Sequence, residues 1–89
     1  MKSYVDPDFV KAFRHLPRTV QQLARAKYRL FRVDPFHPSL QFKRVSAADP
    51  IYSVRINIHY RALGLLEGDR IDWFWIGSHD KYDQLLSSR

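Results

Sequence analysis

Cysteine is absent from the 89-residue chain, which excludes a disulfide framework and any zinc site built from thiolates. No apolar run approaches the roughly 20 residues that a membrane-spanning helix needs, and residues 1–6 lack the apolar core of a signal peptide. Glycine occurs only three times, and neither a phosphate-binding loop nor a dinucleotide-binding fingerprint is present. We therefore expect a cytoplasmic protein that uses no metal and no organic cofactor.

Apolar and aromatic residues are plentiful, at 45% and 15% of the chain. This composition argues against disorder and supplies a core for the single domain, residues 1–89, that the length allows. Basic residues are concentrated in one half. Residues 1–44 hold ten Lys or Arg against three Asp or Glu, whereas residues 45–89 hold five against six. A basic half suggests a polyanion or an acidic protein as partner, although a solvated helix face gives the same pattern.

Two consecutive helices are predicted in the basic half. The first begins after Asp6, which can cap it, with Pro7 in the first helical position, and it ends before Pro17. The second covers residues 18–33, where apolar residues recur at three- and four-residue steps: Val20, Leu23, Ala24, Leu30 and Phe31. Most of its charged positions are arginine: Arg18, Arg25, Lys27, Arg29 and Arg32. Pro35 ends this helix, because proline cannot continue it.

After Pro38 the hydrophobic period changes from 3.6 to 2, which predicts strands. Alternation begins at Leu40 and Phe42, returns in residues 52–56, and continues in two strands joined by a turn at residues 67–69. The last strand alternates Ile71, Trp73 and Trp75 with Asp72, Phe74 and Ile76, so it is apolar on both faces and predicted to be central.

The order of elements predicts an α+β fold. We expect an N-terminal α-hairpin packed on one face of a small twisted antiparallel sheet of three or four strands, the fourth being an edge strand at residues 2–5. The turn near Asn57 is the weaker of the two expected turns, because it has no glycine. Gly77 ends the last strand, and Ser78 can cap a short C-terminal helix.

Four polar side chains are predicted to converge on the sheet: Arg55, Arg61, His79 and Tyr82. The two arginines flank a short turn, and the other two residues follow the strand next to Arg61. RNA cleavage by the 2′-hydroxyl needs a proton acceptor, a proton donor and cations that balance charge on the phosphorane. Histidine transfers protons near pH 7, arginine binds phosphate in a bidentate manner, and an aromatic ring can stack on an unpaired base.

Each of these residues also has a structural interpretation. His79 could be a capping or surface histidine, Arg61 an ion-pair partner of Asp72, and Tyr82 a core residue. Trp73 and Trp75 are interpreted as core. A metal site from His79, Asp80 and Asp83 is disfavoured, since no histidines pair at helical ligand spacing. Catalysis by Ser78, His79 and Asp80 is disfavoured too, because adjacent residues rarely point into one site.

Three short segments occur in a particular order and spacing: Tyr-Ser-Val-Arg-Ile at 52–56, Tyr-Arg-Ala-Leu at 60–63 and Ile-Gly-Ser-His-Asp-Lys-Tyr at 76–82. They follow the α-hairpin, Asp34-Pro35 and Leu40. In this arrangement the chain resembles, over nearly its whole length, the RelE/ParE superfamily of type II toxin–antitoxin toxins. The resemblance implies a RelE-like fold with two helices on a twisted antiparallel sheet, and a toxin that a cognate antitoxin neutralises by wrapping around it.

RelE-type members are ribosome-dependent, metal-independent endoribonucleases that cut mRNA in the ribosomal A site. By this resemblance Arg61 matches the phosphate-stabilising arginine, and Arg55 matches a basic position before the turn. His79 matches a position where relatives carry arginine or histidine, and Tyr82 approximates the aromatic residue that stacks on the mRNA base. The implied function is an mRNA interferase that inhibits translation, with Lys43, Arg44, Arg25 and Arg29 gripping RNA backbone.

Two alternatives stay open. RelE carries a second lysine where this chain has Ser53, which favours a ParE-like inhibitor that binds DNA gyrase without nuclease activity. The chain could also be a catalytically degenerate domain that retains only antitoxin binding. In all three cases exposed apolar residues are expected to gain cover from an antitoxin: Leu63, Leu65 and Phe36.

Overall fold

The computed structural model describes residues 1–87. Its elements follow the chain in this order: β1 (Lys2–Val5), α1 (Pro7–Arg14), α2 (Arg18–Val33), a 3₁₀ turn η1 (Pro38–Leu40), β2 (Lys43–Arg44), β3 (Ile51–Arg55), β4 (Tyr60–Glu67), β5 (Arg70–Ser78) and α3 (His79–Ser87). The strands form one sheet in the order β1-β5-β4-β3-β2. The predicted α+β class, with an N-terminal α-hairpin and a short C-terminal helix, is confirmed.

The sheet has five strands, one more than the sequence predicted. β1 is the expected edge strand, and it runs parallel to β5, whereas the other neighbouring strands are antiparallel. The additional strand is β2, which is two residues long. The alternation expected from Leu40 onward is wrong at its start, because Leu40 belongs to η1 and Gln41 has a left-handed φ of 47°. An extended strand cannot contain that conformation.

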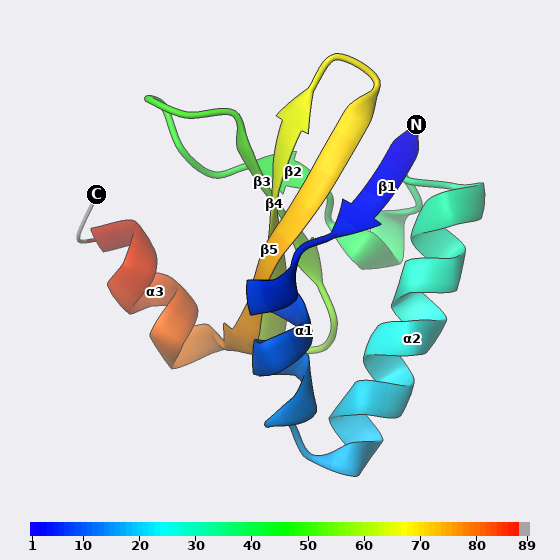
Figure 1. Cartoon of the computed structure of the whole chain (residues 1–89), viewed down its shortest axis with the longest axis vertical. Helices are drawn as coiled ribbons and strands as arrows, with labels where there is room; N and C mark the ends of the chain where they lie inside the picture. The colour runs from blue at the N-terminus through cyan, green and yellow to red at the C-terminus, as the bar shows by residue number, and fades with distance from the viewer. Residues whose placement is uncertain (88–89) are drawn as a thin grey trace.

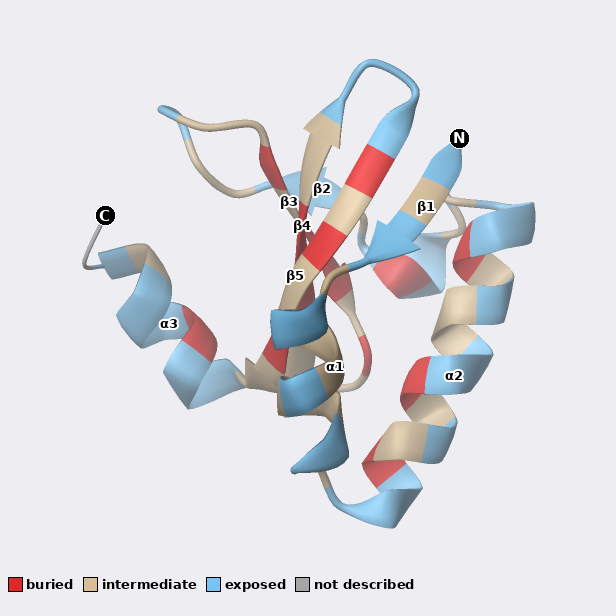
Figure 2. Cartoon of the chain, in the orientation of Figure 1, coloured by how far each residue is buried: buried red, intermediate tan, exposed pale blue. Residues whose placement is uncertain are grey.

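Helices cover both faces of the sheet, whereas the sequence predicted cover on one face only. Figure 1 shows the sheet nearly edge-on, with α2 on one side and α3 on the other. The face under α1 and α2 carries the larger core, to which α2 contributes Val20, Ala24 and Phe31. α3 places Tyr82 on the opposite face against Ile51 and Leu63, and the buried positions of both layers are marked in Figure 2.

Two of the apolar residues expected to be exposed are covered within the chain itself. Leu63 is only 2% exposed, because it lies in the core under α3, and Leu65 is partly buried beside it. Phe36 is 73% exposed, as expected. The prediction of exposure was wrong for Leu63 because it assumed that no helix covers that face.

A β-bulge in β5 separates its two tryptophans. Gly64 pairs with Trp73 and Leu63 pairs with Trp75, which leaves Phe74 as an extra residue in β5. The extra residue reverses the alternation of faces from that point on. Trp73 therefore packs in the core under α1 and α2, whereas Trp75 packs in the core under α3. The expectation that both tryptophans share a face was wrong, although both contribute to core packing.

Local side-chain chemistry sets the expected helix start and turns. The Asp6 carboxylate accepts a 2.9 Å hydrogen bond from the backbone N–H of Phe9, which caps α1. Gly68 has a φ of 59° in the two-residue turn between β4 and β5, where Glu67 pairs with Arg70.

Within residues 1–87 no helix has the length and apolar character needed to cross a membrane.

Gly64 is predicted to tolerate no side chain. A Cβ atom there would lie 2.8 Å from Ile71 Cγ1 and 2.8 Å from Trp73 Cε3, so these buried side chains would have to move. Overpacking of this kind costs about 1–3 kcal/mol, and we expect Gly64→Ala to lower the free energy of unfolding in urea by that amount. Gly68→Asn is the control, because nothing lies within 4 Å of its Cβ and asparagine tolerates positive φ. Equal stability of Gly64→Ala and wild type would contradict the packing described here.

Candidate functional site

Two arginines face each other across neighbouring strands. Arg55 on β3 is the register partner of Arg61 on β4. The turn between them is closed by Asn57, whose side-chain oxygen accepts hydrogen bonds from the backbone N–H groups of His59 (2.8 Å) and Tyr60 (2.9 Å). Like charges directly opposite each other destabilise a sheet. Among residues 1–87 neither arginine forms a salt bridge with a carboxylate, so the pair favours an anion from outside the chain.

Arg61 is held in place by an aromatic ring and an amide. Its guanidinium carbon lies 5.5 Å from the centroid of the Tyr82 ring, within the range of a cation–π contact. Its Nη2 donates a long hydrogen bond of 3.4 Å to Gln41 Oε1. Its Nη1 is buried and has no hydrogen-bond partner in the described chain. A buried donor without an acceptor is unfavourable, and a bound anion would relieve that penalty.

His79 lies at the start of α3, next to Tyr82. The Ser78 hydroxyl accepts a 3.3 Å hydrogen bond from the Lys81 N–H and so caps the helix as expected. The His79 ring stacks on Tyr82, with 5.7 Å between ring centroids and 21° between planes. Its Nε2 lies 3.4 Å from Asp83 Oδ2, one helical turn further on, and its side chain is 46% exposed. The His79 backbone N–H donates a 2.6 Å hydrogen bond to the His59 carbonyl.

Lys43 belongs to the same face of the sheet. It pairs in register with Ser53, which in turn pairs with Leu63, a residue of the core under α3. Register partners project to the same side of a sheet, and Arg55 follows Ser53 by two residues, so Lys43, Arg55 and Arg61 occupy neighbouring positions on three strands. The Ser53 hydroxyl is buried without a hydrogen-bond partner in residues 1–87.

The other predicted RNA contacts lie elsewhere. Arg44 pairs with Tyr52, whose ring packs in the core under α1 and α2, and its Nε donates to the Ser46 carbonyl at 2.9 Å. Arg25 and Arg29 are exposed residues of α2, on the opposite side of the sheet from Tyr82. The structure therefore brings together His79, Tyr82, Arg61, Arg55 and Lys43, and it separates these from Arg44, Arg25 and Arg29.

The structural alternatives are also resolved. Asp72 is the partner of Arg70, at 2.9 Å between Asp72 Oδ2 and Arg70 Nε, so the proposed ion pair with Arg61 is wrong. The hydrogen bonds from Arg70 lower the pKa of the Asp72 carboxyl. Tyr82 is a core residue as well as the support of Arg61, at 7% exposure. Within the described chain no group of three or more His, Cys, Asp or Glu is placed to hold a metal ion.

Two contributors to this face were missed from the sequence. Gln41 reaches Arg61 only because η1 ends in a left-handed residue at this position, and nothing in the local sequence signals that turn. The other is Asp83, which enters the sequence-based predictions only in a disfavoured metal site. Its four-residue spacing from His79 is the signal for a pair on one helix face.

The fold matches those of known toxins. The structure is similar to a RelB–RelE antitoxin–toxin complex from Methanococcus jannaschii, with a TM-score of 0.74, 16% identity, and coverage of 92% of this chain and 96% of that one. A YoeB/ParE toxin from Agrobacterium tumefaciens gives a TM-score of 0.69 at 14% identity, with 89% and 99% covered. The isolated RelE toxin of E. coli gives 0.63 at 15% identity, with 98% and 96% covered. No curated protein sequence matches the chain.

The fold therefore defines a RelE-like protein. Residues 18–84 match the family model of the ParE-like toxin domain, a match that spans α2, every strand except β1, and most of α3. The chain belongs to this family, and thus to the RelE/ParE superfamily of toxins from toxin–antitoxin systems.

Tyr82 is predicted to be essential for the stability of the α3 face. Tyr82→Ala removes the ring that packs on Ile51 and Leu63 and supports Arg61, and loss of a buried aromatic ring costs about 3–5 kcal/mol. Tyr82→Phe keeps the ring, and we expect its free energy of unfolding to lie within about 1 kcal/mol of wild type. Urea denaturation of both variants measures the difference. Similar stabilities for the two variants would show that the ring does not pack as described.

Proposed function

We propose that the protein is a toxin that cleaves mRNA on the ribosome, without a metal ion. The observation that carries the proposal is the pair of cross-strand arginines, Arg55 and Arg61, which lack a carboxylate partner in residues 1–87. Two guanidinium groups on paired residues of neighbouring strands suit a phosphodiester. They would stabilise the extra negative charge of its pentacoordinate transition state. The unpartnered Nη1 of Arg61 would donate to a phosphate oxygen.

His79 would transfer the proton. In the proposed reaction the 2′-oxygen loses its proton and bonds to phosphorus, and the bond from phosphorus to the 5′-oxygen breaks as that oxygen gains a proton. His79 would serve as the general base or the general acid of this step, since imidazole exchanges protons near neutral pH. The Oδ2 atom of Asp83, 3.4 Å from Nε2, would orient the ring.

The remaining site residues would position RNA. The ring of Tyr82 packs against the guanidinium of Arg61. We therefore assign Tyr82 a positioning role, in addition to the proposed stacking on a base. Lys43 would contact a neighbouring phosphate on the same face, in place of the lysine that Ser53 replaces. The other predicted RNA contacts are on the opposite face of the sheet, and we propose that they bind the backbone of ribosomal RNA: Arg44, Arg25 and Arg29. Ribosomal action would also place the protein in the cytoplasm.

The proposed protein partner is a cognate antitoxin. We propose that residues 1–89 form the single domain that this antitoxin neutralises. One structure of similar fold was determined as a RelB–RelE antitoxin–toxin complex. Exposed apolar residues are available for cover, among them Phe36 at 73% and Ile58 at 68% exposure. The basic excess of +6 suits an acidic partner.

A second candidate function is ParE-like inhibition of DNA gyrase. The matching family model is that of ParE-like toxins, and a serine, Ser53, occupies the place of the second lysine. In this case the arginine pair would contact a protein surface. A catalytically degenerate domain that only binds antitoxin would show neither activity.

Cleavage is tested by primer extension on an mRNA in a cell-free translation reaction. We expect cuts that require ribosomes. His79→Ala should slow them about 100- to 10,000-fold, because general acid–base catalysis contributes that much, and Arg61→Ala at least about 100-fold, through loss of transition-state charge stabilisation. His15→Ala and Arg14→Ala are the matched controls, since both residues are exposed at the end of α1. Wild-type cleavage rates in both site variants would refute the assignment.

The gyrase alternative is decided with the same protein preparations. If folded wild-type protein yields no ribosome-dependent cut but blocks DNA supercoiling by purified gyrase, the ParE-like function replaces the proposed one. If it yields neither effect, the domain is degenerate and retains only antitoxin binding.

A further inference from the structure

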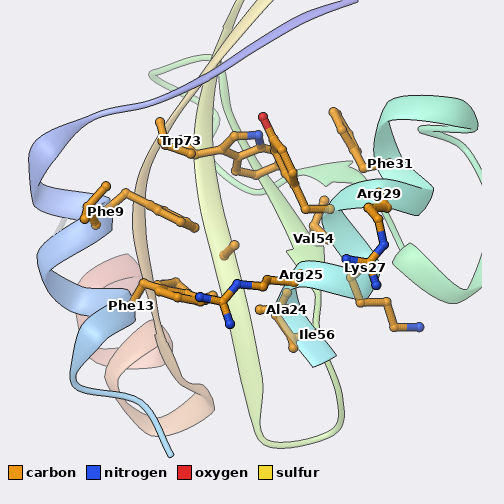
Figure 3. A pocket seen from close by; sticks show the side chains of 15 residues that line it. Phe9, Phe13, Ala24, Arg25, Lys27, Arg29, Phe31, Val54, Ile56 and Trp73 are labelled. Carbon is orange, nitrogen blue, oxygen red and sulfur yellow. The ribbon is translucent and has the colours of Figure 1, made fainter. Parts of the chain in front are cut away.

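A cavity of about 320 Å³ lies between the N-terminal helices and the sheet. α1 forms one wall with Phe9 and Phe13, and α2 forms the other with Ala24 and Phe31, while Trp73 lies on the floor (Figure 3). Its volume falls within the range of about 300–1,000 Å³ that is typical of small-ligand sites. The cavity is on the opposite side of the sheet from Tyr82, so it is separate from the proposed cleavage site around Arg61 and His79.

The chemistry of the walls selects the kind of molecule that can enter. The inner lining consists of aliphatic and aromatic side chains, including Val54, Ile56 and Ala62. The indole N–H of Trp73 is already bonded to Ser3 Oγ at 3.0 Å. A polar group of a ligand would find no hydrogen-bond partner in this apolar lining unless the ligand itself supplied one, which makes its burial unfavourable. A hydrocarbon chain has no such groups, and each CH₂ that it buries contributes about 0.8 kcal/mol.

The rim of the cavity is cationic. Arg25, Lys27 and Arg29 line it from α2. The Arg25 guanidinium lies 5.0 Å from the centroid of the Phe13 ring, so it reaches from α2 to α1 beside the cavity, as Figure 3 shows. α2 contains no Asp or Glu, and within residues 1–87 neither Arg25 nor Arg29 forms a salt bridge. These charges complement an anionic head group.

We propose that this cavity binds a single-chain anionic amphiphile, a free fatty acid of medium chain length. Its hydrocarbon chain would lie between Phe13, Phe31 and Trp73, and its carboxylate would bind Arg25 and Arg29. The inference does not rest on the cleavage chemistry, because the proposed cleavage residues Arg61 and His79 lie on the opposite face of the sheet, beside Tyr82. A carboxylate bound at Arg25 and Arg29 would occupy two of the side chains proposed above to contact ribosomal RNA backbone. A fatty acid would match both the charge of Arg25 and Arg29 and the apolar side chains that line the cavity next to them.

Quenching of tryptophan fluorescence tests the proposal, because only one of the two tryptophans lines the cavity. The probe is a bromine-substituted dodecanoate, used below its micelle concentration, since bromine quenches an indole that it touches. We expect saturable quenching in wild type and in Trp75→Phe, and none in Trp73→Phe, where the remaining indole lies on the other face. Saturable quenching in Trp73→Phe, or its absence in wild type, would overturn the proposal.

Two further variants test the fit and the charge. Ala24→Leu fills the cavity from α2. We expect it to weaken binding at least about tenfold, because it displaces CH₂ groups of the ligand that each contribute about 0.8 kcal/mol, while circular dichroism shows an unchanged fold. The double variant Arg25→Gln/Arg29→Gln should weaken binding of the dodecanoate about tenfold, as expected for loss of a charge-assisted hydrogen bond, and leave binding of dodecanol unchanged. Wild-type affinity in Ala24→Leu would place the ligand elsewhere.

Competition identifies the source of the ligand. Unlabelled dodecanoate should displace the brominated probe. Displacement by phosphatidylglycerol vesicles but not by free dodecanoate would show a membrane-binding surface instead, and displacement only by an acidic peptide would show a protein-docking groove. Either result would overturn the proposal of a free fatty acid.

Discussion

The bulge at Phe74 is the constraint on which the rest of the molecule depends. Before it, β5 directs Trp73 toward α1 and α2, and after it the strand directs Trp75 toward α3. A sheet with aromatic side chains on both faces needs cover on both. α3 supplies the second layer through Tyr82, and the same packing places the Tyr82 ring under Arg61 and His79 beside it. The geometry of the candidate site is therefore a consequence of how the sheet is covered.

Much of the fold could be predicted from local chemistry. Asp6 caps α1 through a hydrogen bond within one turn, and Asn57 closes its turn through side-chain hydrogen bonds to nearby backbone N–H groups. Gly68 allows the other turn because it adopts a positive φ without a steric cost. The bulge could not be predicted, because an extra residue in one strand is defined only by the register of its partner. The side of the sheet that α3 covers depends on that register, and so does the burial of Leu63.

The candidate site was predictable to the extent that it depends on strand pairing. Arg55 and Arg61 flank a short turn, so their opposition follows from the hairpin, and His79 follows from the strand beside it. The placement of Arg25, Arg29 and Arg44 could not be read from charge alone, since a basic half does not indicate which face of a sheet its residues occupy. Gln41 reaches Arg61 because its backbone adopts a left-handed conformation, which no sequence pattern predicted.

The hydrogen bond from the His79 N–H to the His59 carbonyl has a consequence for how such chains can diverge in length. It joins the first residue of α3 to the turn between β3 and β4, so an inserted or deleted residue in that turn would displace the imidazole together with the loop. In the loop between β2 and β3, Ala47 and Ala48 are both exposed, and exposed loop tips tolerate insertions. Among related chains we therefore expect insertions and deletions to be more frequent in the loop between β2 and β3 than in the turn between β3 and β4.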